Sequence, residues 1–197
     1  MDINYDTIQE IQNGDINKVK ILLDKGANDY FCFIIWASDC GHIDIVNLLL
    51  EKFTVDDKEY YNQPMRHAAM NGHINIVKLM LDLGADNYNQ VMYASTERNT
   101  EQGINIVKLM LDSGADNYNE VMVGAVYIGN IHIVRLMLER GARKCNRPLI
   151  AAITHNHEDI ALLMLEKGAN NYDKALSYAQ GHMKDIINCY KEGKIKL

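Results

Sequence analysis

The sequence predicts an all-α fold, a solenoid of about seven helical repeats, and three observations support this prediction. An apolar string that ends in glycine returns along the chain, an element that begins with Tyr-Asn returns with it, and the copies together fill the 197 residues. Self-similarity at a period of about 20–50 residues is typical of stacked supersecondary units. The composition, 48% hydrophobic and 23% charged, is that of a globular protein and excludes wholesale disorder.

The apolar string is the expected second helix of each repeat. Residues 74–82 (Ile-Asn-Ile-Val-Lys-Leu-Met-Leu-Asp) return almost unchanged at residues 104–112, and looser copies occur elsewhere. Their apolar side chains occupy more than one stripe of a helix, so neighbouring repeats must cover them. The glycine that follows, as at Gly84 and Gly114, is expected to end the helix in the left-handed conformation. The seven anchor positions are 26, 53 (a phenylalanine), 84, 114, 141, 168 and 193.

The Tyr-Asn element is the expected first helix. Residues 88–92 and 118–122 show it clearly, and we expect its Asn or Asp to be the N-cap, because that side chain can accept an unpaired backbone N–H. Pro64 and Pro148 then lie in the first turn, where the missing N–H costs nothing. The residue four places after the proline position is always small, which predicts that neighbouring backbones approach closely there. These small residues are Ala37, Ala68, Ser95, Ala125, Ala152 and Ala179.

Charge and apolar runs exclude some classes of partner. The net charge of −6 argues against a protein that binds nucleic acid by neutralising phosphates. The longest uninterrupted apolar run, residues 31–37, is far shorter than the ~20 residues of a membrane span. The first six residues do not resemble a secretory signal, so we expect a cytoplasmic protein with reduced cysteines that binds neither nucleic acid nor membrane.

Residues 63–77, with Gln-Pro-Met-Arg-His-Ala-Ala, then Gly-His and Ile-Val, resemble the core of an ankyrin repeat. Residues 147–152 (Arg-Pro-Leu-Ile-Ala-Ala) are a second good match, and the resemblance extends over essentially the whole chain. It implies one ankyrin-like domain over residues 1–197, an all-α solenoid of helical hairpins. The repeats are expected at about 4–30, 31–60, 61–87, 88–117, 118–144, 145–171 and 172–197.

The repeats differ from the family pattern in two ways. An ankyrin unit has about 33 residues, whereas most units here have 27 to 30. The step from Gly84 to Val91 is only 7 residues, so we expect truncated β-hairpin fingers, and only the step from Phe53 to Pro64 is near full length. The segment between Ser95 and Gly103 is longer by about three residues and is either a specificity loop or a tolerated bulge. Shortened units rich in Asn, Ile, Tyr and Lys resemble those of giant DNA viruses of amoebae, and proteins of intracellular bacteria would look similar.

No catalytic, cofactor or metal site is visible in the sequence. His42, His73, His157 and His182 lie at the Gly-His turn of the repeat and are expected to stabilise that turn. His155 and His157 lack further ligands at metal-binding spacing, and a zinc site needs about four. The recurring tyrosines and methionines are expected to pack within the stack, with contact to a partner as the alternative.

The resemblance implies a concave face lined by the end of each first helix, where the residue types change from repeat to repeat. Aromatic, Met and Arg side chains are enriched in binding hot spots. We therefore expect a protein partner to contact Trp36, Arg66, Met70, Tyr93, Arg98 and Tyr127.

The predicted function is a non-catalytic, monomeric protein–protein interaction module. If its source is a virus or an intracellular parasite, it would act as an adaptor or inhibitor of a host factor, in the host cytosol or nucleus. Two alternatives stay open: an enzyme or small-ligand-binding protein with a pocket on the concave face, and a structural protein that self-associates through the region of Trp36.

Overall fold

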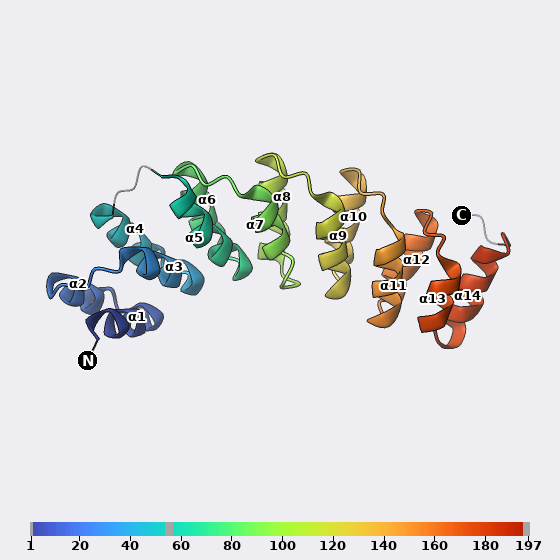
Figure 1. Cartoon of the computed structure of the whole chain (residues 1–197), viewed down its shortest axis with the longest axis horizontal. Coiled ribbons are helices and arrows are strands. Elements are labelled where there is room, and N and C mark those ends of the chain that lie inside the picture. Colours follow the sequence, from blue (N-terminus) through green and yellow to red (C-terminus); the bar gives the residue numbers. More distant parts are fainter. Residues whose placement is uncertain (1, 54–56, 195–197) are drawn as a thin grey trace. The chain divides into compact units, whose positions relative to one another are not determined.

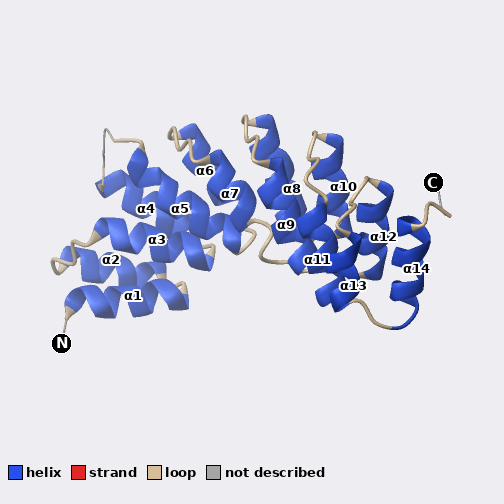
Figure 2. Cartoon of the chain, turned by 45° about the vertical axis from the view of Figure 1, so that its right-hand side comes forward, coloured by secondary structure: helices blue, strands red, loops and turns tan. Residues whose placement is uncertain are grey.

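The computed structural model describes residues 2–53 and 57–194, and over these residues it contains fourteen α-helices and no strand (Figures 1 and 2). The helices are α1 (Ile3–Asn13), α2 (Ile16–Asp24), α3 (Tyr30–Cys40), α4 (Ile43–Lys52), α5 (Glu59–Met70), α6 (Ile74–Asp82), α7 (Tyr88–Ala94), α8 (Glu101–Asp112), α9 (Tyr118–Tyr127), α10 (Ile131–Glu139), α11 (Asn146–Thr154), α12 (Glu158–Glu166), α13 (Tyr172–Tyr178) and α14 (Gly181–Lys191).

The helices pack as neighbouring pairs, which confirms the predicted all-α repeat of helical hairpins. The chain forms two compact units, Met1–Gly114 and Ala115–Leu197. In the first unit α1, α3, α5 and α7 pack side by side, and each also packs on the second helix of its own pair. The second unit repeats the arrangement, with α9, α11 and α13 side by side. The connection from α6 to α7 is only five residues long, residues 83–87, as expected for truncated fingers.

The small-residue seam is buried as predicted. Ala37, Ala68, Ala125 and Ala152 are 0% exposed, and Ser95 and Ala179 are each 2% exposed. In five of the described pairs the second helix adds a fully buried valine, at Val19, Val46, Val77, Val107 and Val134. Burying such a side chain is worth about 1.5–3 kcal/mol, and each pair obtains that burial only from its neighbours.

The glycines after the second helices adopt the left-handed conformation, as predicted. Gly84 has φ 97°. Its N–H donates to Leu81 O at 2.9 Å, and the next N–H, of Ala85, donates to Met80 O at 3.0 Å. These two bonds pair carbonyl groups that the end of a helix leaves free. Gly26, Gly114, Gly141 and Gly168 have the same sign of φ.

The predicted N-cap of the first helices is wrong. Helices α7, α9 and α13 begin at the tyrosine itself, with the preceding asparagine as N-cap, so the Asn or Asp after the tyrosine lies inside the first turn. In α9 the side chain of that asparagine instead accepts backbone N–H groups from the turn that leads into the next repeat. Asn119 Oδ1 accepts from Arg143 N at 3.0 Å and Lys144 N at 2.9 Å. Asn4, Asn62 and Asn146 make the same bonds 24 residues ahead.

Pro148 lies in the first turn of α11, as predicted, but Pro64 does not lie in a first turn. Helix α5 begins at Glu59, so Pro64 is its sixth residue. The residues before the proline extend the helix toward the N-terminus beyond the short first helix of the other repeats. Residues 54–56, which belong to the long step between Phe53 and Pro64, lie outside the described residues.

The histidines of the Gly-His turns lie over a glycine of the preceding repeat. A Cβ added to Gly41 would come within 2.5 Å of the His73 ring, and His73 Nε2 is 3.0 Å from Asp39 O. His42 covers Gly14 and His157 covers Gly129 in the same way. The prediction is wrong for His182, because Asn156 (φ 58°) stands where the others have glycine, and His182 pairs instead with Glu158 Oε1 at 2.9 Å.

Candidate functional site

A chain of polar contacts joins three successive repeats in the first unit. Asp39 lies near the end of α3, His67 lies in α5 and Asn71 follows α5. Asp39 Oδ1 is 3.0 Å from His67 Nδ1 and accepts from Asn71 Nδ2 at 3.0 Å. Arg98 Nη2 donates to Asn71 Oδ1 at 2.8 Å. We call Asp39, His67, Asn71 and Arg98 the polar network.

The position of these residues in the repeat explains why they meet. Asp39 and Asn71 occupy the end of the first helix in two repeats whose first helices pack side by side. Two contacts to backbone oxygens hold the network in place: His73 Nε2 contacts Asp39 O, and the Asn71 side-chain amide also donates to His67 O at 3.2 Å. The His67 and Asp39 side chains are still 32% and 35% exposed, so the network is both ordered and accessible from the surface.

Arg98 belongs to the insertion between α7 and α8, which is folded. Ser95 and Thr96 are each 2% exposed, and their hydroxyl groups donate to Val91 O and Tyr93 O. Thr100 is the N-cap of α8 and accepts from Gly103 N at 3.1 Å. These bonds fix both ends of the insertion, so that Arg98 at its exposed tip can reach Asn71.

The other predicted contact residues of the first unit lie in the first helices α3, α5 and α7. Trp36, Arg66 and Met70 are half-buried side chains of α3 and α5. Tyr93 of α7 is 47% exposed. Of the predicted residues only Arg98 enters the polar network. Its partners Asp39, His67 and Asn71 lie at the variable positions of the repeat, but residue type alone did not single them out.

In the second unit Tyr127 forms a smaller aromatic group. Its ring, 44% exposed, meets the His155 ring edge to face at 5.1 Å, and His155 stacks on His157 at 6.3 Å. Tyr127 also borders a cleft of about 390 Å³ that runs over α11 to α13, with Arg147 and Lys174 on its rim. The sequence did not point to either cation, because both precede the proline position of their repeat, whereas the predicted contact residues all follow it.

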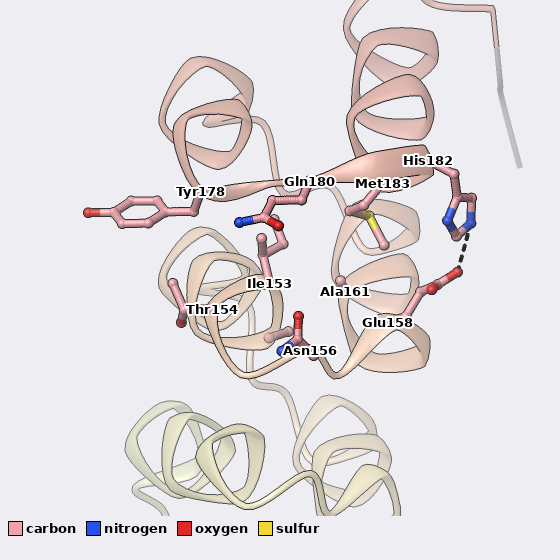
Figure 3. A pocket seen from close by; sticks show the side chains of 10 residues that line it. Ile153, Thr154, Asn156, Glu158, Ala161, Tyr178, Gln180, His182 and Met183 are labelled. Carbon is pink, nitrogen blue, oxygen red and sulfur yellow. Dashed lines mark ion pairs between the residues drawn. The ribbon is translucent and has the colours of Figure 1, made fainter.

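A second cleft, of about 450 Å³, lies where α11 and α12 meet the turn before α14 (Figure 3). Helix α13 ends at Tyr178, and only Ala179 and Gln180 separate it from α14. The seventh repeat therefore has a shorter connection between its helices than the sixth. Ile153, Gln180 and Met183 line the opening, and the His182–Glu158 ion pair closes one side of it.

The described cysteines and metal-ligand types form no reactive cluster at these sites. Burial raises the pKa of the Cys32, Cys40 and Cys145 thiols, which reduces the fraction of reactive thiolate at neutral pH. Among the described residues, no three His, Cys, Asp or Glu side chains gather to hold a metal ion. Within the same part of the chain, none of the helices has the length and apolar character that crossing a membrane requires.

Comparison with protein families agrees with this architecture. The family model described as ankyrin repeats (3 copies) matches residues 8–91 and 91–175, which is most of the chain. The comparison with curated proteins finds no match.

Proposed function

The chain belongs to the ankyrin repeat family, and we therefore propose that it binds a protein partner on the face formed by the ends of its first helices. Ankyrin repeats are in general protein–protein interaction modules. The observation that carries the proposal is the polar network from Asp39 to Arg98, which crosses three repeats and keeps its side chains accessible.

The network favours a partner because its geometry is set before binding. A side chain that is already held loses little conformational entropy when a partner contacts it. In the described residues Arg98 uses one of its guanidinium N–H donors on Asn71, so the others are available to an acceptor on the partner. Tyr93 and Arg98 are exposed residues of the types enriched in hot spots, and Trp36, Arg66 and Met70 are half-buried residues of the same types.

The finer parts of the proposal follow from the sequence. The module acts without catalysis and as a monomer, in the cytoplasm, and its partner is a protein, because a net charge of −6 disfavours binding to nucleic acid. The resemblance of its shortened repeats to those of giant DNA viruses supports a role as an adaptor or inhibitor of a host factor.

The test is quantitative affinity capture with the intact chain and two variants. Arg98→Ala removes the exposed end of the network, whereas Lys78→Ala removes an exposed cation from the second helix α6 and serves as the matched control. We expect one captured polypeptide to fall at least about tenfold with Arg98→Ala, the effect of about 1.4 kcal/mol at a hot spot, and to stay unchanged with Lys78→Ala. Equal capture by all three proteins would contradict the proposed face.

The cleft beside Tyr127 favours a second candidate, a small-ligand site along the first helices of the second unit. Its volume of about 390 Å³ falls within the range of ligand pockets. A metabolite screen by native mass spectrometry separates the two: a stoichiometric small molecule lost with Tyr127→Ala supports this candidate, and its absence argues against it.

A further inference from the structure

A cleft of about 380 Å³ lies between the second helices α10 and α12 of the second unit, away from the ends of the first helices. Its apolar wall is buried: Leu138 is 8% exposed, Leu163 4%, Cys145 4% and Ala142 0%. Its rim is charged, with Arg135, Arg143 and Lys167 against a single carboxylate, Glu139.

The repeat that lines this cleft departs from its neighbours at three successive positions. The turns at residues 84–88 and 114–118 both read Gly-Ala-Asp-Asn-Tyr, whereas residues 141–145 read Gly-Ala-Arg-Lys-Cys. Cys145 therefore stands where the other repeats place a tyrosine, and two cations replace an aspartate and an asparagine.

Two other repeats show where that tyrosine belongs. The Tyr30 ring stacks at 6.1 Å on Phe53, which follows the last turn of α4, the second helix of its own pair. In the last repeat Tyr172 begins α13, which packs on α14, and burial together with Glu166 and Tyr172 raises the pKa of Tyr190 in the last turn of α14. At Cys145 the corresponding space is at the end of α12, where Leu163 and Lys167 line the cleft.

The cations are placed to hold an anion at this space. Arg143 Nη1 donates to Leu138 O at 3.0 Å and Ala142 O at 2.8 Å, which fixes its guanidinium at the rim. Arg143 and Lys167 both act on the Cys145 thiol, since each offsets part of the increase in its pKa that burial causes. Three cations and one carboxylate leave the cleft with two positive charges in a chain whose net charge is −6.

We propose that this cleft binds an aryl phosphate, with the aromatic ring in the space left by the missing tyrosine and the phosphate among Arg135, Arg143 and Lys167. The phosphate carries about −1.5 to −2 charges at pH 7, which matches the excess charge of the rim. Arg143 offers the planar fork of donors that binds phosphate oxygens well. The aryl phosphate is either a free small molecule or a phosphotyrosine side chain.

The test is an NMR titration of the intact chain with phenyl phosphate, inorganic phosphate and phenylacetate. We expect saturable shifts at residues 135–145 and 163–167, and a Kd for phenyl phosphate at least about tenfold below that of the other two probes, because only it offers both ring and dianion. No saturable binding, or equal binding of inorganic phosphate, would overturn the proposal.

Variants locate the site. Cys145→Tyr restores the residue of the other repeats, so the variant should fold, which thermal melting will verify. Its tyrosine ring should fill the cleft and abolish binding of phenyl phosphate. Cys145→Ser is the matched control and should bind phenyl phosphate normally. Lys167→Gln should weaken binding about threefold to tenfold, and Glu139→Gln should strengthen it. A folded Cys145→Tyr protein that binds as the unmodified chain does would refute the placement. If Cys145→Tyr does not fold, unchanged binding by Arg135→Gln/Lys167→Gln would refute it.

A phosphotyrosine peptide and free phosphotyrosine distinguish the two sources. Binding of the peptide at least about tenfold tighter than the free amino acid assigns the cleft to a protein-borne phosphotyrosine. Equal binding assigns it to free aryl phosphates.

Discussion

Replacing Gly41 with alanine tests how one repeat is joined to the next. Gly41 has φ 82°, and an added Cβ would come within 2.5 Å of the His73 ring. Alanine in the left-handed region costs about 1–2 kcal/mol. Displacing the ring also breaks the contact between His73 Nε2 and Asp39 O, worth about 0.5–1.5 kcal/mol. The free energy of unfolding should therefore fall by about 1.5–3.5 kcal/mol.

Gly26→Ala is the matched control. Gly26 has φ 107°, but an added Cβ there meets nothing within 4 Å, so only the backbone cost of about 1–2 kcal/mol applies. Urea unfolding followed by helical circular dichroism gives both values. If both variants lose the same free energy within about 0.5 kcal/mol, the histidine does not couple the repeats as described.

Four further predictions follow from the structure. Asn119→Ala removes the acceptor of two backbone N–H groups and should lower the free energy of unfolding by about 1–3 kcal/mol in urea, whereas Asn105→Ala, at an exposed position of α8, should change it by less than about 0.5 kcal/mol. Met80→Ala, at a fully buried position, should cost about 2–5 kcal/mol, and a loss below about 0.5 kcal/mol would contradict the packing of α6. Tyr127→Ala, at a side chain that is 44% exposed, should leave the melting temperature nearly unchanged, and a large drop would show that the ring is structural. Because burial raises the pKa of the Cys145 thiol above 9.0, the thiol should react slowly with a disulfide reagent at pH 8 and faster only above pH 9, and rapid reaction at pH 8 would contradict this. The folded state favours the neutral thiol, so the contribution of Cys145 to stability is present below pH 9 and is lost as the pH rises above it.

The repeat architecture was predictable because its signals are local. The buried alanines follow from the recurrence of small residues such as Ala68 and Ala152, and the left-handed glycines follow from their place after an apolar helix. The role of asparagine was not predictable, since Asn119 has the same chemistry whether it caps its own helix or accepts from a turn 24 residues ahead. The boundaries of the seven repeats and the extent of the single domain stay predictions.

The candidate site was predictable only in part. Position in the repeat led to Arg98 and Tyr127, and the structure places Arg98 in the polar network and Tyr127 at the rim of a cleft. The selection of aromatic, Met and Arg residues passed over Asp39, because a carboxylate gains its role only from the His67 and Asn71 side chains that the next repeat brings to it.

Hydrogen–deuterium exchange of the chain, alone and bound to its captured partner, tests most directly whether the ends of the first helices form the binding face. Binding there should slow exchange in residues 36–41, 66–71 and 93–98 and leave the second helices α4, α6 and α8 unchanged. Slowed exchange confined to those second helices would contradict the proposed face.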